Sequence, residues 1–353
     1  MGVSLTILLF ALAAADASQP YLVSANAMKV QSLPADRITW LFGNVEITHG
    51  ATVLRGDSAW ASSASDKAVI WGHFRMTDRT VVITGAKAVY TKQQGRAVVY
   101  GAPKASDNGW NMDADSIVYL KSLTRSQAYG RVRLSDSTGR NRVFGSYGEY
   151  WHDKAYGVLT GRPKFVMSSE DTAKKPSFIY ADTMEIEQNG ALAVGTGDVR
   201  YEGDSVWASC GRLSYYKPQG RIVLERQPRI WEPGSEIRAR DITMQLEGDA
   251  FKTVWARDSV TLLQFGASSP DTDMITGDSL WAAFEQKKIA RAKVMDNAWS
   301  RYHQLAKDKT AGRNLAAGAL MDFTFRDGRI ARITITGGAR GAYLETAKGK
   351  AAP

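Results

Sequence analysis

The stretch Ala114-Asp115-Ser116-Ile117-Val118-Tyr119 decides the fold, because its pattern recurs along the chain. The first position of each copy is a small residue, and the second is a polar or small residue. Apolar and polar positions then alternate, and the copy usually ends on an aromatic side chain. The second position of successive copies falls at residues 57, 86, 115, 146, 182, 211, 240, 278 and 319. The commonest step is about 29 residues, a period typical of stacked supersecondary units.

Alternation with period two indicates β-strands rather than helices. A turn follows each copy, and some of these turns contain Gly or Pro, as in Lys92-Gln93-Gln94-Gly95 and Tyr216-Lys217-Pro218-Gln219-Gly220. A second strand then follows, as in Gly43-Asn44-Val45-Glu46-Ile47. The sequence therefore predicts an all-β fold of strand-turn-strand repeats, each with one wet face and one dry face.

We call the second position of each copy the recurring slot. The residues two and four places after this slot are predicted to face an apolar interior, together with their partners on the second strand. They form either a packed core or the lining of a groove that can open. Val118 lies between two of them and is predicted to face outward. The predicted interior set is Val45, Ile47, Ile117, Tyr119, Val132, Leu134, Tyr150, Phe165, Met184, Ile186, Val199, Tyr201, Leu213 and Tyr215.

The N-terminus has the features of a secretory signal peptide. Leu5 to Ala15 is an apolar run too short to span a membrane, and Ala15-Asp16-Ala17 fits a small-x-small cleavage site. We therefore expect an exported protein that is cleaved before Ser18. The predicted organisation is a signal peptide (1–17), a lead-in (18–39), a first β segment (40–167), a linker or loop (168–177), a second β segment (178–345) and a disordered tail (346–353).

Composition narrows the function class. The formal net charge is +9, which favours anionic partners, while export argues against nucleic acid. Cys210 is the only cysteine, so an intramolecular disulfide and a cysteine-based metal site are excluded. It stands at a position usually filled by Gly or Ala, which predicts a small buried residue.

Catalytic patterns are missing from the sequence. The four histidines lack ligand spacing, and neither a nucleophile elbow nor a phosphate-binding loop appears. The recurring acids Asp57, Asp115, Asp182 and Asp278 occur once per unit, as residues that cap a turn do. We therefore expect a binding protein or scaffold without a catalytic site, metal or cofactor.

At this point the chain resembles the OstA-like, LptA-type lipopolysaccharide-transport proteins. The resemblance rests on motifs that recur in order from about Trp40 to Leu344. They are Gly43-Asn44-Val45-Glu46-Ile47 with Val53-Leu54-Arg55-Gly56-Asp57, Lys67-Ala68-Val69-Ile70-Trp71-Gly72, Gly161-Arg162-Pro163-Lys164-Phe165, Asp327-Gly328-Arg329-Ile330-Ala331-Arg332-Ile333 and Gly338-Ala339-Arg340-Gly341-Ala342-Tyr343.

The resemblance implies an open, twisted β-jellyroll whose apolar groove shields the acyl chains of lipopolysaccharide in the periplasm, on the way to the outer membrane. It also implies edge-to-edge joining with other jellyrolls of the same transport system, and makes a second copy of this chain a further candidate partner. Because the chain is about twice as long as a minimal LptA domain, a double-length bridge or a stand-alone OstA-like protein is expected.

Two other function classes compete with transport. A structural or adhesin-like β-repeat protein of the cell envelope would need neither the basic balance nor an apolar lining wide enough to part. A carbohydrate-processing enzyme on a right-handed β-helix would need a cluster of acids on one sheet face, whereas the repeat supplies single acids. The sequence favours the lipid-transport interpretation.

Overall fold

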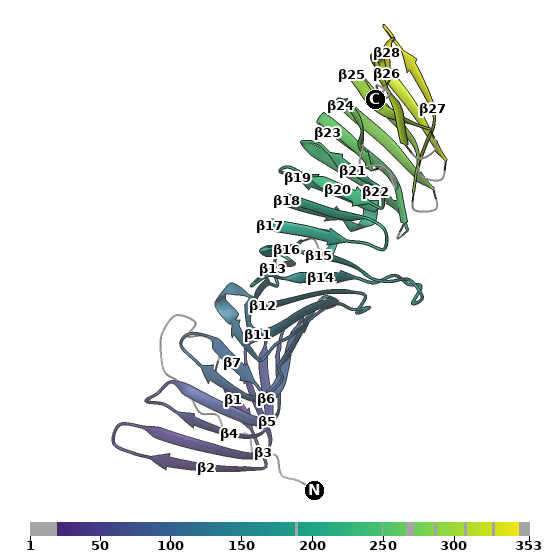
Figure 1. Ribbon diagram of the computed structural model, residues 1–353. Coiled ribbons are helices and arrows are strands. Elements are labelled where there is room, and N and C mark those ends of the chain that lie inside the picture. The colour runs from purple at the N-terminus through teal and green to yellow at the C-terminus, as the bar shows by residue number, and fades with distance from the viewer. Residues whose placement is uncertain are drawn as a thin grey trace, which may run out of the picture. The chain divides into compact units, whose positions relative to one another are not determined.

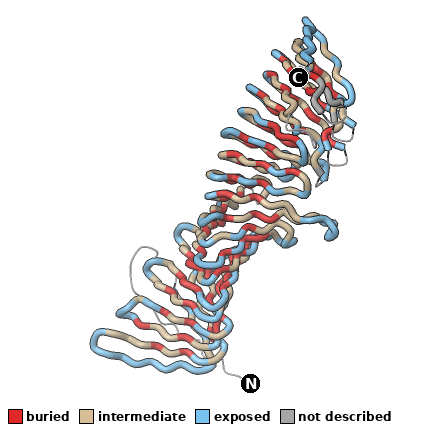
Figure 2. Tube along the Cα trace, in the orientation of Figure 1, coloured by how far each residue is buried: buried red, intermediate tan, exposed pale blue. Residues whose placement is uncertain are grey.

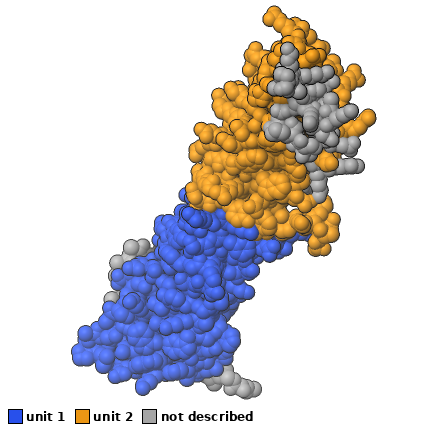
Figure 3. Space-filling model, in the orientation of Figure 1, with its two compact units in different colours: residues 1–165, 183–190 blue, residues 166–182, 191–353 orange. Residues whose placement is uncertain are grey.

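A computed structural model of the protein describes residues 20–187, 190–248, 250–265, 272–285, 288–306, 309–326 and 329–345. The predicted signal peptide and C-terminal tail lie outside the described residues. The chain separates into two compact units, coloured in Figure 3. Unit 1 comprises residues 1–165 and 183–190, and unit 2 comprises residues 166–182 and 191–353.

Unit 1 consists of antiparallel strands, most of which are labelled in Figure 1. Its strands are β1 (Leu22–Ser24), β2 (Ala27–Ser32), β3 (Arg37–His49), β4 (Thr52–Ser62), β5 (Lys67–Asp78), β6 (Val81–Thr91), β7 (Arg96–Tyr100), β8 (Lys104–Asp107), β9 (Trp110–Asp113), β10 (Ser116–Leu120), β11 (Arg125–Asp136), β12 (Asn141–Trp151), β13 (Tyr156–Thr160) and β16 (Thr183–Glu187). The 3-10 turn η1 (Lys121–Leu123) joins β10 to β11.

Unit 2 repeats this antiparallel construction. The strand β14 (Lys164–Met167) leads out of unit 1, and the 3-10 turn η3 (Lys217–Gln219) follows β18. The strands of unit 2 are β15 (Ser177–Tyr180), β17 (Leu192–Glu202), β18 (Trp207–Tyr216), β19 (Arg221–Glu225), β20 (Arg229–Glu232), β21 (Ser235–Arg238), β22 (Asp241–Glu247), β23 (Ala250–Phe265), β24 (Thr272–Glu285), β25 (Lys288–Ala306), β26 (Lys309–Arg326), β27 (Arg329–Thr336) and β28 (Arg340–Glu345). The all-β fold class predicted from the sequence is confirmed.

The long strands bend at corners where two residues leave the hydrogen-bonded ladder. In β5 the register with β6 shifts between Trp71 and Phe74, because Gly72 (φ +75°) and His73 (φ +47°) adopt left-handed backbone. Between β7 and β8 the same bend falls at Gly101 (φ +79°) and Ala102 (φ +52°). Each bend directs the chain from one layer of the unit into the other.

The recurring slot of the sequence lies against these corners. Asp115 Oδ2 accepts a hydrogen bond from the backbone N–H of Arg131 at 3.2 Å, and Asp182 Oδ2 accepts one from Asp198 at 3.2 Å. A Cβ at Gly130 would lie only 2.2 Å from Asp115 Oδ2, so a side chain at that corner is excluded. The slot acids therefore act as turn caps, as the sequence analysis proposed.

The bends divide unit 1 into two layers. Layer A holds β2, β7, β10, β13, β16 and the adjoining halves of the long strands. Layer B holds β1, β8, β9 and the other halves. Side chains on the facing sides of the layers are buried, and Figure 2 shows buried residues alternating with exposed ones along the strands. The core therefore lies between the layers.

Val118 faces outward, as predicted. Its register places it on the outer side of layer A, opposite Gln127 and Val98, yet it is only 5% exposed. Neighbouring valines of the same outer row cover it, and Val98 is itself 7% exposed. An outward direction therefore does not make this position accessible to solvent.

Both ends of the chain carry open strand edges. Within the described ranges, β2 pairs only with β3, and all six residues of β2 are exposed. At the other end, β28 pairs only with β26, and all six of its residues are exposed. Met28 lies opposite the buried Leu41 yet is 39% exposed, because no further strand covers it. Backbone groups and interior-facing side chains are thus accessible at the ends.

Candidate functional site

Most of the predicted interior residues are buried, and their role as the lining of a lipid groove stays a prediction. In layer A of unit 1, cross-strand pairing joins Tyr119, Ser126, Tyr150, Gly157 and Ile186 into one row. A second row contains Ile117 and Met184, while Val45, Ile47, Val132 and Leu134 occupy layer B.

Phe165 is buried in β14, and unit 2 holds Val199, Tyr201, Leu213 and Tyr215. All members of the predicted set except Ile47 and Tyr215, which are half-buried, are buried.

The interior is closed by its own side chains. Ile117, Met184 and Leu213 are all 0% exposed, so these positions meet no solvent. The arrangement is therefore a packed core in this conformation, with a lining chemistry that matches hydrocarbon.

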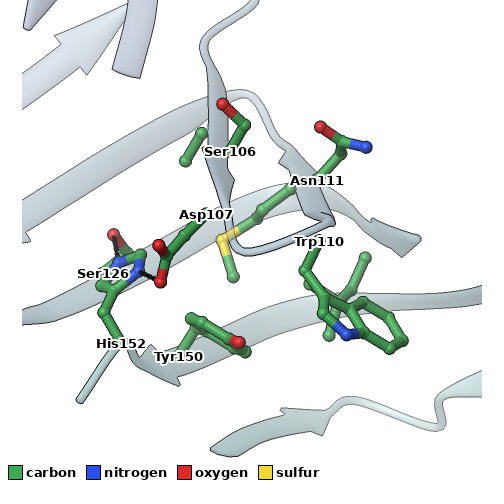
Figure 4. A pocket seen from close by; sticks show the side chains of 10 residues that line it. Ser106, Asp107, Trp110, Asn111, Ser126, Tyr150 and His152 are labelled. Atoms are coloured by element: carbon green, nitrogen blue, oxygen red, sulfur yellow. Dashed lines mark hydrogen bonds and ion pairs between the residues drawn. The ribbon is translucent and has the colours of Figure 1, made fainter. Parts of the chain in front are cut away.

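Polar side chains close unit 1 along the seam where the free ends of layers A and B meet. Tyr119 of β10 donates its hydroxyl hydrogen to Asp78 Oδ2 of β5, at 2.8 Å. His152, just after β12, contacts Asp107 Oδ2 of β8 through Nδ1 at 2.9 Å. Its Nε2 lies 2.8 Å from Ser126 Oγ of β11. Figure 4 shows His152 between Asp107 and Ser126, beside Tyr150.

Burial favours the neutral forms of His152, Tyr119 and Tyr150. Desolvation lowers the pKa of His152, although the Asp107 carboxylate opposes this. A neutral ring donates Nδ1–H to Asp107 and accepts the Ser126 hydroxyl hydrogen at Nε2. Desolvation raises the pKa of Tyr150 to about 12. It also raises the pKa of Tyr119, and the hydrogen bond from Tyr119 to Asp78 adds to that rise. These two phenols therefore remain protonated at neutral pH.

The sequence analysis missed this seam, because its partners are far apart in the chain. Ser126, His152 and Asp107 have the connectivity of a hydrolase triad. However, Ser126 is 0% exposed, and the adjoining cavity, lined by Met112, Leu134 and the residues of Figure 4, measures about 10 Å³. That volume accommodates about one water molecule. The arrangement leaves no room for an ester and serves to hold the layers together. Asp78, Asp107 and Asp136 recur at hairpins 29 residues apart, which is the signal that could have revealed it.

Unit 2 closes its interior differently. Tyr201 packs edge-on against Phe251, with ring centroids 5.8 Å apart. His303 contacts Asp273 Oδ1 at 2.8 Å through Nδ1. Cys210 lies opposite the buried Val199, and burial raises the pKa of its thiol to about 12. The thiol is therefore a buried apolar group, as predicted, and not a nucleophile.

Two further searches of the described residues bear on function. Within them, no group of three or more His, Cys, Asp or Glu side chains is placed to hold a metal ion. In that same part of the chain, no helix has the length and apolar character needed to cross a membrane.

Comparison with known proteins identifies the N-terminal part of the chain. Residues 22–124 match the model of the family described as LptA/(LptD N-terminal domain) LPS transport protein. No curated protein matches the chain.

Among solved structures, the chain is similar to LptH, the LptA homologous periplasmic component of the conserved lipopolysaccharide transport device from Pseudomonas aeruginosa. The identity is 18%, the TM-score is 0.29, and the match covers 38% of this chain and 92% of LptH. The fold described above rests on the strand register of this chain and not on that likeness. The family match over residues 22–124 confirms the expected resemblance of this chain to the OstA-like, LptA-type lipopolysaccharide-transport proteins.

Proposed function

We propose that this protein binds lipopolysaccharide and passes it along the envelope, with the acyl chains between the two layers of each unit. The observation that carries the proposal is the apolar interior of each unit, in a chain whose residues 22–124 match a lipopolysaccharide-transport family. Burial contributes about 0.8 kcal/mol per CH₂ group, so an acyl chain of a dozen carbons gains roughly 10 kcal/mol at most. That gain is large enough to offset separation of the layers.

The seam of unit 1 is the proposed entry for the acyl chains. Asp78–Tyr119 and Asp107–His152 are hydrogen bonds between the free ends of the layers, whereas the corners are continuous backbone. Opening the seam breaks only these few side-chain hydrogen bonds and admits water that replaces the lost partners, so it costs less than breaking a backbone ladder. The layers therefore part at the seam while the corners act as the hinge.

The open ends supply the proposed partner sites. The exposed strands β2 and β28 each present unpaired backbone groups, on which another jellyroll can add a strand. Other jellyroll components of the transport system, or a second copy of this chain, would extend the apolar interior from one molecule to the next. A passive array of this kind supplies no energy, so the direction of transport must come from its partners.

The proposed location is the periplasm, reached through the predicted signal peptide at residues 1–17, with association at the outer membrane. A non-catalytic structural role in the cell envelope is the alternative. That alternative predicts a permanently closed interior and no affinity for lipid.

A charge placed in the interior tests the proposal. Tyr215→Asp introduces a carboxylate at a half-buried interior position, so the protein can fold around it. We expect the variant to bind lipopolysaccharide at least tenfold more weakly, because acyl chains would have to bury the charge. Binding is measured with purified lipopolysaccharide after circular dichroism confirms the β fold.

Trp255→Asp is the matched control, since Trp255 is 41% exposed on the outer surface of the same unit. It introduces the same charge and removes an aromatic side chain without touching the interior. Equal affinity of wild type, Tyr215→Asp and Trp255→Asp would contradict an interior lipid site in unit 2.

A further inference from the structure

Three successive corners of unit 1 share a pattern that the interior does not need. In each one, an aromatic residue precedes the corner glycine, and a cationic residue follows four places after the aromatic. The three pairs are Trp71 with Arg75, Tyr100 with Lys104, and Tyr129 with Arg133. Each pair therefore straddles a bend between layers A and B, with the aromatic on layer A and the cation on layer B.

The aromatic members form one row on the outer side of layer A. Cross-strand pairing runs in the order Phe42, Ser58, Trp71, Lys87, Tyr100, Ser116, Tyr129 and Tyr147. Trp71, Tyr100 and Tyr129 are 38%, 44% and 41% exposed. They occupy every second strand, so their rings are about 10 Å apart. Large aromatic side chains are thus held in water at regular intervals.

The cationic members form a parallel row on the outer side of layer B. Pairing there runs in the order Arg55, Arg75, Thr84, Lys104, Asp113 and Arg133. Arg133 forms an ion pair with Asp113 at 2.7 Å, whereas Arg75 and Lys104 have no ion-pair partner among the residues that the structure describes. The row therefore retains positive charge for an external anion.

A groove lies between the second and third pairs. It has a volume of about 720 Å³, and its lining includes Gly101, Ala102, Asp115, Arg131, Arg133 and Phe144. Phe144, one of these lining residues, is 38% exposed. The Arg131 side chain is 92% exposed, so its guanidinium reaches solvent even though it pairs with Asp115. The groove is large enough for several sugar rings.

Unit 2 shows that the corners do not require this pattern. The residues that precede its left-handed corners are Thr196, Glu225, Arg257, Met295 and Thr336. None is aromatic, yet the interior of unit 2 is as fully buried as that of unit 1. The exposed aromatic row is therefore a property of the outer surface of unit 1 and not of the fold. Exposed apolar groups that gather in one place mark an interaction site.

The aromatic row (Trp71, Tyr100 and Tyr129) and the cationic row (Arg75, Lys104 and Arg133) together form a ridge on the outer surface of unit 1. We propose that this ridge binds the phosphorylated saccharide part of lipopolysaccharide. The inference rests on the proposed function and specifies where the anionic end of lipopolysaccharide is recognised. Aromatic rings pack against the apolar faces of pyranose rings, and Arg and Lys donate charge-assisted hydrogen bonds to phosphate. Repeated aromatic and cationic positions suit a chain of linked rings with phosphate groups. A flat apolar partner surface would not need the cation that accompanies each aromatic.

The test measures binding of lipid-free, phosphorylated core saccharide, prepared from deacylated lipopolysaccharide, by isothermal titration calorimetry. The test variant is Tyr100→Ala with Tyr129→Ala. The control is Trp207→Ala with Tyr343→Ala, two aromatics of unit 2 that are 43% and 46% exposed outside the row. Two lost stacking contacts predict about tenfold weaker binding or more for the test variant, and wild-type affinity for the control.

Two further ligands complete the test. Enzymatic dephosphorylation of the saccharide is expected to weaken binding to the wild type, because Arg75, Lys104 and Arg133 lose their partners. Anionic phospholipid vesicles without saccharide are expected to bind the wild type and the double tyrosine variant equally. Failure of the wild type to bind the lipid-free saccharide, equal binding by the tyrosine variant, or vesicle binding that depends on the two tyrosines would each overturn the proposal.

Failure of the saccharide site can be distinguished from failure of the proposed interior lipid site. The double tyrosine variant leaves the interior untouched. The acyl chains of bound lipopolysaccharide should therefore still cross-link to photoreactive residues placed in the interior. Loss of saccharide binding with acyl contact retained supports two sites. Saccharide binding without any acyl contact would leave the ridge proposal standing and contradict the interior one.

Discussion

The corners of unit 1 and unit 2 solve one geometric problem with different residues. In unit 1 the corner begins with glycine, as at Gly72, Gly101 and Gly130, and an aromatic residue precedes it. In unit 2 left-handed backbone also occurs at side-chain-bearing pairs, such as Arg226-Gln227 and Asp258-Ser259. The buried rows are alike in the two units. The repeat thus preserves the interior and the bend, while the outer surface varies independently.

The largest effects should be the same in both units, because the interiors are equivalent. Ile117→Ala and Leu213→Ala each remove a side chain that is 0% exposed. Each should lower the free energy of unfolding by about 2–5 kcal/mol, through lost burial and the cavity left behind. Urea denaturation with hydrogen exchange of each unit measures the two costs. A cost below about 1 kcal/mol in one unit alone would break the equivalence.

Glycine corners should be intolerant of a side chain. Gly130→Ala combines a φ of +92° with a Cβ only 2.2 Å from Asp115 Oδ2. The expected loss of stability is about 1–3 kcal/mol, measured by urea denaturation. Gly139→Ala is the control, because Gly139 is also left-handed (φ +67°) but has nothing within 4 Å of a Cβ. Equal losses would show that crowding by the capping acid is unimportant.

Acid should weaken the seam of unit 1. Desolvation holds the pKa of His152 below its value in the unfolded chain, so the unfolded state binds more protons between the two values. Stability is therefore fully present above about pH 6.5 and falls as the pH drops below it, by up to about 1.4 kcal/mol per pH unit. Asp107, Asp153 and Asp78 oppose the shift and limit its size.

Hydrogen exchange of β10–β12 at pH 5.5 and pH 7.5 measures this effect. His152→Gln, which retains hydrogen-bonding groups but cannot titrate, should lose most of the difference. A variant with the same pH dependence as the wild type would remove His152 as the cause.

The smallest expected effect is a gain of stability, from a substitution at a corner of unit 2. Arg226 adopts a φ of +65°, a conformation that costs a residue with a Cβ about 1–2 kcal/mol. Arg226→Gly relieves that cost but makes the unfolded chain more flexible, so a net gain of about 0.5 kcal/mol is expected. Thermal unfolding checks the direction. A loss of stability would mean that Arg226 makes contacts that outweigh the strain.

The sequence predicted the fold well because its signals are local. Alternation identified the interior rows, and the recurring acids marked the corners, as Asp115 and Asp182 show. The seam could not be predicted in the same way. Tyr119 and Asp78 are 41 residues apart, and His152 and Asp107 are 45 apart, so only the folded layers bring them together.

The exposure of the outward-facing residues could not be predicted from the sequence pattern either. Val118 and Tyr129 both alternate to the outer side, yet Val118 is 5% exposed and Tyr129 is 41% exposed. The difference depends on cross-strand neighbours, because Val118 is paired with Val98 whereas Tyr129 is paired with the smaller Ser116. Period-two alternation assigns a face, but it does not report what covers that face.

Photo-cross-linking to lipopolysaccharide tests the central claim, that the interior takes acyl chains, most directly. A benzophenone amino acid replaces Tyr150 in unit 1, Tyr201 in unit 2, or Trp207 as control. Tyr201 is 4% exposed and faces inward, whereas Trp207, on the neighbouring strand, is 43% exposed. The account predicts acyl-chain adducts at Tyr150 and Tyr201 and none at Trp207. Folded protein without adducts at either interior position would contradict it.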